Sequence, residues 1–220
     1  MEITTLAQFE RQTGIHITRK HTGKMKGKHS LSTSVLCNPI CQARAKNGDS
    51  VCSHCYAAKM LSGIYKTSEP CFARNYDLLQ KPLKVVPKFS DGWKTFRFES
   101  LGDVASQIQV HNYMLIARAN PNVVCTLWTK NLEIVKEVLK YERKPKNMII
   151  IQSANRINHS VKPKYAFVDK VFTVYDSYET AEKNGKHINC EAKAKHLRCE
   201  DCNRCYDLNN KDVYINEILK

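Results

Sequence analysis

From about residue 93 onward, short apolar stretches alternate regularly with amphipathic ones. Two kinds of segment share this region. The first kind, rich in β-branched and aromatic residues, predicts strands at WKTFRFES (93–100), VVCTLWT (123–129), MIIIQS (148–153) and KVFTVYD (170–176). The second kind has helical periodicity and covers 106–120, 131–142 and 177–185. Asn131 is placed to cap the second of these helices, and Gly185 to end the third.

Strands that alternate with helices predict parallel pairing and right-handed crossovers. The fold class is therefore α/β, either a partial (β/α) barrel or an open parallel sheet, with four or five strands visible. The 220 residues are fewer than the roughly 250 of a complete eight-stranded barrel. Cysteine-rich loops, which we expect to bind metal, lie near both ends of this core.

The N-terminal half is less regular. A short helix is expected at 5–12, and LSTSVL (31–36) predicts a strand that runs into Cys37. Residues 56–79 are helical in pattern, and Pro70 should divide them into two helices. We accordingly expect a basic N-terminal segment (1–30), an α/β core (31–189) and a C-terminal cysteine segment (190–220) packed on that core.

Polar residues directly follow the predicted strands, where the chemistry of parallel α/β folds usually collects. The candidates for catalysis at these positions are Glu99, Asp103, Lys130 and Asn155. Helix capping would account for Asn131 and for Asp103, but it explains neither Glu99 nor Lys130.

Eight of the ten cysteines fall into two sets of four. The N-terminal set is Cys37, Cys41, Cys52 and Cys55, and the C-terminal set is Cys190, Cys199, Cys202 and Cys205. The N-terminus lacks the apolar stretch of a signal peptide, and no apolar run is long enough to span a membrane, so we expect a cytoplasmic protein with reduced thiols. Cysteines in that compartment point to metal binding rather than disulfides. Of the remaining two, Cys125 is expected in the core, and Cys71 either in the core or as a spare ligand.

The spacing of the cysteines bears on which metal they bind. The run C-x2-C-x2-C at 199–205 winds one loop around three ligand positions, as in ferredoxin-type [4Fe–4S] clusters. Zinc usually takes two separated pairs, so it remains the alternative, especially for the N-terminal set. If only three cysteines of that set bind a cluster, one iron stays open for a substrate or cofactor.

The net charge of +14 suggests an acidic partner, most often nucleic acid. The densest basic run lies between residues 19 and 29 and contains Arg19, Lys20, Lys24, Lys26 and Lys28. Either this run follows a phosphate backbone, or it is a solvated loop with no such role. No aromatic interleaving favours the first interpretation.

Four motifs occur in the order of a known family: CSHCYA, FRFESLGDV, LWTKN and CEDCNRCYD. Together they resemble the phage gene product 88 family over about residues 30–208. The resemblance implies iron–sulfur binding by both cysteine sets and contact of Glu99, Ser100 and Asp103 with a cofactor. That family is similar in outline to the partial barrels of radical S-adenosylmethionine enzymes, so S-adenosylmethionine is a further candidate cofactor. The chain departs from those enzymes in lacking a compact C-x3-C-x2-C motif.

Two hypotheses follow from these features. The first is an iron–sulfur protein with one or two [4Fe–4S] clusters that carries out redox or radical chemistry on a nucleotide or nucleic acid, in the host cytoplasm if a phage encodes it. The second is a nucleic-acid-binding protein without catalytic activity, in which zinc or a cluster only stabilises the loops.

Overall fold

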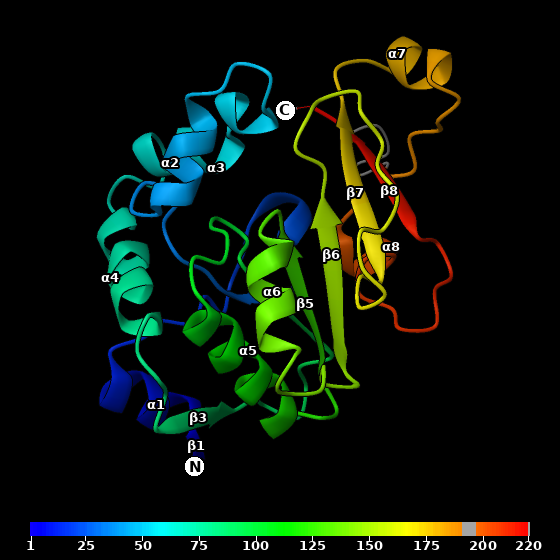
Figure 1. Ribbon diagram of the computed structural model, residues 1–220. Coiled ribbons are helices and arrows are strands. Elements are labelled where there is room, and N and C mark those ends of the chain that lie inside the picture. The colour runs from blue at the N-terminus through cyan, green and yellow to red at the C-terminus, as the bar shows by residue number, and fades with distance from the viewer. Residues whose placement is uncertain (191–196, 220) are drawn as a thin grey trace.

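A computed structural model of the protein describes residues 1–190 and 197–219. Figure 1 shows the chain as a ribbon. The strands are β1 (Glu2–Thr5), β2 (His29–Leu31), β3 (Val85–Lys88), β4 (Thr95–Phe98), β5 (Val124–Thr129), β6 (Met148–Ser153), β7 (Lys170–Tyr175) and β8 (Tyr214–Ile218). The α-helices are α1 (Leu6–Thr13), α2 (Pro39–Ala45), α3 (Tyr56–Ser62), α4 (Glu69–Leu79), α5 (Gln107–Ala119), α6 (Leu132–Val138), α7 (Tyr178–Lys183) and α8 (Cys199–Cys202). Two short 3₁₀ helices are η1 (Gly23–Met25) and η2 (Val51–His54).

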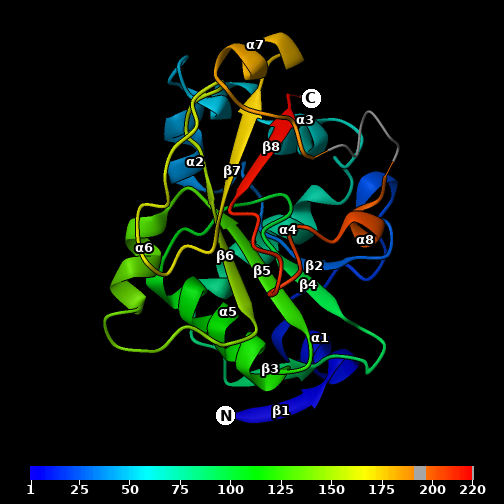
Figure 2. The ribbon, with the colours of Figure 1, turned by 90° about the vertical axis from the view of Figure 1, so that its right-hand side faces the viewer.

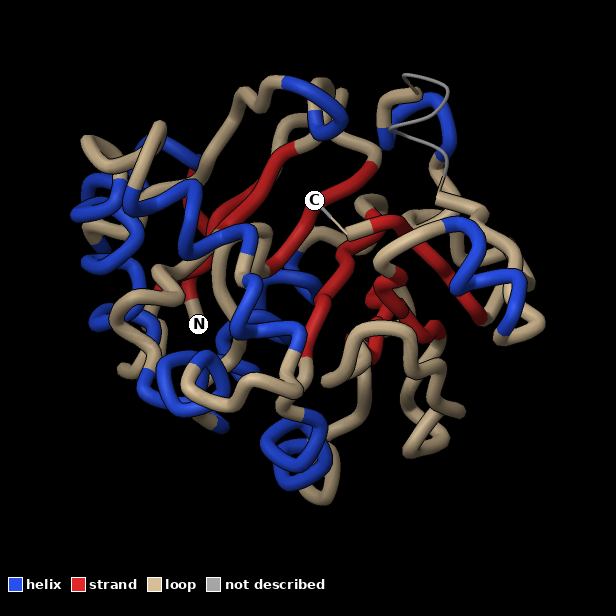
Figure 3. The backbone as a smooth tube through the Cα atoms, turned by 90° about the horizontal axis from the view of Figure 1, so that it is seen from above, coloured by secondary structure: helices blue, strands red, loops and turns tan. Residues whose placement is uncertain are grey.

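Six strands form one sheet in the order β2-β4-β5-β6-β7-β8, and every neighbouring pair is parallel. The strand order follows the chain without the reversal that marks a doubly wound sheet. β2 and β8 do not pair with each other, so the sheet is open. The expected α/β class with an open parallel sheet is therefore confirmed. In the view from above, strands occupy the middle of the molecule, with helices around them (Figure 3).

The two faces of this sheet are covered differently. Alternate side chains of β4, β5 and β6, such as Phe98, Leu127 and Ile150, belong to the main core together with residues of α5. The opposite face carries Trp128 and Ile151, which pack with the C-terminal segment. Figures 1 and 2 show α5 and α6 on one side of the sheet and α8 on the other.

The N-terminal residues form part of the same body. Thr5 caps α1 in a reciprocal capping box with Gln8, which confirms the expected helix. β1 pairs with β3 in a small second sheet. Phe9, Ile15 and Ile17 are buried in the main core.

Several expectations about individual elements are confirmed. The four strands from residue 93 onward are present as β4 to β7, and their helices as α5, α6 and α7. Gly185 adopts a left-handed conformation after α7, with φ of 64°. Residues 56–79 form two helices, but Pro70 lies in the first turn of α4 rather than at the break.

Three expectations were wrong or incomplete. The strand expected at 31–36 is instead His29–Leu31. The hydroxyl groups of the next three residues, Ser32, Thr33 and Ser34, form hydrogen bonds with Ser100, Glu99 and Glu69, and the chain leaves the sheet there. Asn131 precedes α6, but its side chain does not cap the helix and donates to the carbonyl oxygen of Val104, at 2.5 Å. The last strand of the sheet, β8, was not predicted from the sequence.

None of the helices within the described residues is long and apolar enough to cross a membrane.

Candidate functional site

The N-terminal cysteine segment lies across the ends of three strands. Because all six strands are parallel, their carboxyl ends meet at one edge of the sheet. Three hydrogen bonds join this edge to residues 38–51. Asn38 Nδ2 donates to the carbonyl oxygen of Asp103, beyond β4, at 2.9 Å. The Arg44 side chain donates to the carbonyl of Lys130, beyond β5, and the Val51 amide to that of Asn155, beyond β6.

Asn38 connects the strand edge to the first helix of this segment. It is buried and is the N-cap of α2. Its side-chain oxygen accepts from the amides of Ile40, at 3.0 Å, and Cys41, at 3.4 Å. Since the same side chain donates to Asp103, the backbone of Cys41 is held at a fixed place over the end of β4.

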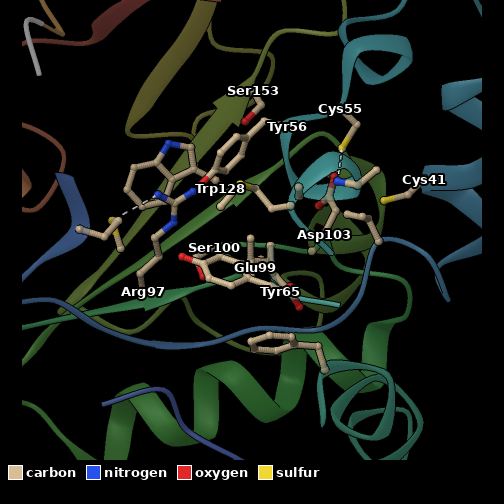
Figure 4. A pocket seen from close by; sticks show the side chains of 18 of the residues that line it. Cys41, Cys55, Tyr56, Tyr65, Arg97, Glu99, Ser100, Asp103, Trp128 and Ser153 are labelled. Atoms are coloured by element: carbon tan, nitrogen blue, oxygen red, sulfur yellow. Dashed lines mark hydrogen bonds between the residues drawn. The ribbon is translucent and has the colours of Figure 1, made fainter. Parts of the chain in front are cut away.

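Three cysteines of the N-terminal set face a common cavity. Cys41, Cys52 and Cys55 line it, whereas Cys37 is not among its lining residues and lies 3.9 Å from Glu69 Oε1. Burial raises the pKa of the Cys41 thiol far above its usual range, with Asp103 and Cys52 acting in the same direction. Figure 4 shows Cys41 and Cys55 on the same side of the cavity as Asp103.

The four cysteines of the C-terminal set lie close to one another on the sheet face. Burial raises the pKa of Cys205 to about 12, and Cys190, Cys199 and Cys202 raise it further by charge repulsion. Cys199 and Cys205 pack against the apolar cluster of Trp128, Ile149, Ile151 and Tyr206. None of the four forms a disulfide with another described cysteine.

Both cysteine sets open onto one cavity of about 1400 Å³. Seven cysteines line it: Cys41, Cys52, Cys55, Cys71, Cys190, Cys199 and Cys205. Between the two sets, the wall includes Arg97, Ser100 and Trp128, which Figure 4 shows together. A group bound at either set would therefore face the same space.

Glu99 is a buried carboxyl group with an unusual backbone. Its φ of 58° is rare for a residue other than glycine. Such backbone strain persists only where the surrounding contacts enforce it. The carboxylate accepts from the Thr33 amide, at 3.0 Å, from Gln109 Nε2, at 2.6 Å, and from the Tyr113 hydroxyl. Burial nevertheless raises the pKa of Glu99 to about 7, against the lowering effect of these bonds.

Gly102 makes room for this arrangement. A Cβ atom at residue 102 would lie 2.1 Å from Glu99 Oε2 and 2.8 Å from the carbonyl oxygen of Thr33. The glycine of the FRFESLGDV motif is thus required by close approach to a carboxylate and a backbone carbonyl. The buried Glu99 is a proton-holding group at the cavity wall.

Asp103 joins two strand ends rather than pointing freely into the cavity. Its side chain accepts from the Thr129 hydroxyl, at 2.5 Å, and from the Lys130 amide, at 3.1 Å. Arg44 lies 3.7 Å away as its ion-pair partner. Lys130 also lines the cavity and acts electrostatically on Cys41. These contacts bring Asp103, Lys130 and Cys41 into one neighbourhood.

Ser100 belongs to a chain of hydroxyl groups that reaches a histidine. Its side chain lies 2.6 Å from Ser32 Oγ and 3.2 Å from Ser30 Oγ. His21 Nε2 lies 2.9 Å from Ser30 Oγ and also lines the cavity. Burial, aided by Arg97 and His29, lowers the pKa of His21 to about 4. A neutral imidazole is therefore connected to the candidate cofactor-contacting serine.

Asn155 lies apart from this group. It is exposed and lines a second hollow of about 390 Å³, which it shares with Lys130 but with none of the cysteines. The structure thus brings Glu99, Ser100, Asp103 and Lys130 together at the main cavity, and places Asn155 outside it, at the second hollow.

Arg97 and Trp128 are two site residues that were not predicted from the sequence. The guanidinium carbon of Arg97 lies 3.9 Å from the centre of the Trp128 ring, a cation–π contact. Arg97 Nη1 lies 3.8 Å from the sulfur of Met25, and its Nε is buried without a hydrogen-bond partner within the described residues. The sequence signal for them was their position on adjacent strands. Each lies one residue from a side chain that faces the core, so each faces the opposite side of the sheet.

The basic run at 19–28 packs largely against the protein itself. Arg19 pairs with Glu10, and Lys24 Nζ lies 2.5 Å from Glu217 Oε1. Lys28 is only 4% exposed. Lys20 and Lys26 are the two exposed lysines of the run. A continuous phosphate-binding surface would need all five side chains in solvent, so this arrangement offers at most a part of one.

The two cysteine sets offer thiols, which are ligands of both zinc and iron–sulfur clusters. In the two described stretches, no three His, Cys, Asp or Glu side chains gather closely enough to hold one metal ion. Zinc requires thiolates about 2.3 Å from one centre, whereas a [4Fe–4S] cluster spreads its ligands around four irons. The thiols suit either group chemically, and Cys37 is the member of the N-terminal set that does not line the cavity.

Comparison with known proteins gives one match. A family model described as gene product 88 matches residues 9–208, a span that includes both cysteine sets and all the strand-end residues. No curated protein and no solved structure matches the chain.

Proposed function

The chain belongs to the gene product 88 family of phage proteins, and we propose that it binds iron–sulfur clusters and carries out one-electron chemistry on a small molecule held between them. The observation that supports this most strongly is the single cavity onto which cysteines of both sets open. A purely structural zinc site is usually closed by four ligands and has no need of a cavity.

The C-terminal set would hold a cluster with Cys190, Cys199, Cys202 and Cys205. The N-terminal set would hold one with Cys41, Cys52 and Cys55, because Cys37 is turned toward Glu69. Such clusters supply one-electron transfer and, where an iron is open, a binding position for a substrate or for a cofactor such as S-adenosylmethionine. Three cysteines at the cavity leave that position available.

The other cavity residues have roles that need no cluster chemistry. Asp103 and Asn38 orient the segment that carries Cys41. Glu99, with a pKa of about 7, holds or releases a proton near neutral pH. Arg97 and Lys130 favour an anionic molecule, and Trp128 offers an aromatic surface beside Arg97. A nucleotide combines these two properties, so we propose nucleotides as the substrate class.

The test is anaerobic purification, an absorption spectrum, and analysis of iron, sulfide and zinc. We expect a brown protein with about eight irons, four for each cluster. Cys52→Ser with Cys55→Ser should remove about half of the iron, and Cys199→Ser with Cys202→Ser the other half. Cys71→Ser is the matched control, since Cys71 lines the cavity outside both sets. A colourless protein with stoichiometric zinc would overturn the proposal and favour the nucleic-acid-binding alternative.

A further inference from the structure

The second hollow, of about 390 Å³, lies at the carboxyl ends of β5 and β6. Its wall is formed by α2, by residues 130–134 at the start of α6, and by residues between 152 and 164. Ligands of open parallel sheets commonly bind outside the strand ends, and small-molecule sites have volumes of about 300–1,000 Å³. The hollow therefore has the place and the size of a ligand site.

Positive charge dominates the lining of this hollow. Its charged lining residues are Arg44, Lys130, Arg156, Lys164 and Glu133. Lys164 pairs with Glu133, at 2.5 Å. Lys130 and Arg156 have no carboxylate within ion-pair distance in the part of the chain that the structure describes. The hollow thus keeps positive charge that the described residues do not balance.

Arg44 adds hydrogen-bonding capacity that the protein leaves unused. Its Nη2 donates to the carbonyl oxygen of Lys130, at 3.4 Å, while its Nη1 lies 3.7 Å from Asp103 Oδ2, beyond hydrogen-bond distance. Nη1 is buried and has no hydrogen-bond partner among the described residues. A buried N–H group without an acceptor is costly, so this atom points to an acceptor that the chain does not supply.

The segment that follows β6 is held in place on both sides of Arg156. Gln152 Oε1 accepts from the Lys164 amide, at 2.8 Å. Asn158 Nδ2 donates to Asp176 Oδ2, at 2.7 Å. The backbone that carries Arg156 is therefore already ordered, and binding at the hollow does not have to order it first.

The hollow adjoins the main cavity. Lys130, Ser153 and Ala154 line both spaces. Figure 4 shows Ser153 among the side chains of the main cavity. Because the two spaces share this wall, one extended ligand can occupy both.

We infer that the second hollow binds the phosphate groups of the substrate nucleotide, while the base and the sugar lie in the main cavity. This inference rests on the proposed function, which gives nucleotides as the substrate class. Phosphate oxygens carry the negative charge that Lys130 and Arg156 lack as a partner, and they accept hydrogen bonds from several donors at once. Asn155, which also lines the hollow, offers a further amide donor. A nucleic-acid backbone would instead need an extended basic surface.

The test is isothermal titration calorimetry with inorganic tripolyphosphate and with each of the common nucleoside triphosphates. Arg156→Ala should weaken tripolyphosphate binding about tenfold, because it removes a charged donor. Lys162→Ala is the matched control, since Lys162 is exposed on the same segment but does not line the hollow. At least one nucleoside triphosphate should bind the wild-type protein more tightly than tripolyphosphate does, because the main cavity adds contacts.

Glu133→Gln should change the affinity in the opposite direction. It removes the carboxylate from the lining and leaves Lys164 available to the ligand. Tripolyphosphate should then bind about threefold more tightly. A gain in affinity cannot come from damage to the fold.

Absence of tripolyphosphate binding, or equal affinities of the wild-type and Arg156→Ala proteins, would overturn the inference. An equal loss in Arg156→Ala and Lys162→Ala would also overturn it, because general attraction to a basic protein would explain the binding. If no nucleoside triphosphate bound more tightly than tripolyphosphate, the assignment of the ligand as a nucleotide would be wrong. Iron analysis of the same samples tests the proposed function separately, since a protein without iron would overturn the clusters and leave the affinities to decide on the hollow.

Discussion

The two cysteine sets are attached to the same sheet in different ways. The N-terminal set lies over the strand ends and is held by hydrogen bonds, such as those of Asn38 to Asp103 and Cys41. The C-terminal set lies against one face of the sheet and is held by ring contacts, such as Tyr206 with Trp128 at 5.5 Å.

Because of this difference, we expect the two sets to lose their iron through different substitutions. Directed hydrogen bonds depend on single polar atoms, so one substitution can release the N-terminal segment. Ring and cation contacts depend on area and burial, so the C-terminal segment should respond most to loss of an aromatic side chain. A single substitution that removed the iron of both sets would contradict this expectation.

The largest expected effect comes from Trp128→Ala. The ring is 8% exposed and supports both Tyr206 and Arg97. Its loss should lower the free energy of unfolding by about 3–5 kcal/mol, measured by urea denaturation. Iron bound by the C-terminal set should fall, while the N-terminal set keeps its iron.

The control for that prediction is Trp93→Ala. Trp93 packs against the main core and stacks on His29, with ring centres 3.7 Å apart, on the helix-covered side. This variant should be less stable but keep its full iron content. A Trp128→Ala protein with unchanged iron would show that ring packing does not hold the C-terminal set.

The next largest expected effect is a pH dependence of the free energy of unfolding that is caused by Glu99. Its pKa is about 7 in the folded protein, against 4.5 for an ordinary glutamate. Between these values the folded state binds more protons than the unfolded state, so the free energy of unfolding should fall as pH rises from about 4.5 to about 7. The total loss should be about 3 kcal/mol.

Glu99→Gln should remove this slope, because glutamine does not ionise in that range. The measurement is urea denaturation at several pH values between 4.5 and 8. Glu182→Gln makes the same change of charge at an exposed position and should keep the wild-type slope. If Glu99→Gln kept that slope as well, another buried group would be responsible.

The sequence predicted the parts of the fold that depend on local pattern. β5 and β6 are long apolar runs, and the hydroxyl of Ser106 caps α5 as such a residue should. β8, YINEI, was missed because Asn216 and Glu217 interrupt its apolar pattern, although both are buried by tertiary contacts. Local pattern does not report burial that distant segments create.

The candidate site was predictable in part for the same reason. Parallel strands bring their carboxyl ends together, so the proximity of Glu99, Asp103 and Lys130 followed from the fold class alone. The buried positions of Lys28 and Lys170 did not follow, because a lysine in a basic run is normally solvated. Their burial depends on contacts with residues 203–212, far away in the sequence.

A smaller effect is expected from Asn38→Ala, which tests the hydrogen-bonded attachment. The change leaves the Asp103 carbonyl and the Cys41 amide without their partner, at a cost of about 1–3 kcal/mol. Iron of the N-terminal set should be lost preferentially. Asn75→Ala is the matched control, since Asn75 is equally buried and bonds to the backbone of His16 and Ser32. If both variants lost the same iron, general destabilisation would explain the result.

The smallest effect concerns the exposed lysines, which separate the structural and nucleic-acid-binding interpretations of the basic run. Lys20→Ala with Lys26→Ala should change the free energy of unfolding by less than about 0.5 kcal/mol. Arg19, Lys20 and Lys26 are exposed, but Arg19 is paired with Glu10, which leaves Lys20 and Lys26 as the exposed residues outside a described ion pair. The run therefore contributes at most about 1.8 to the slope of log K against log salt for duplex DNA, rather than the roughly 4.5 of five phosphate contacts.

Single variants decide between a salt slope of about 1.8 and one of roughly 4.5. Lys24 is paired with Glu217, whereas Lys26 is exposed on the same segment. We expect Lys24→Ala to lower stability and leave the salt slope of DNA binding unchanged. An equal fall in slope for Lys24→Ala and Lys26→Ala would mean that the ion pair opens to bind phosphate.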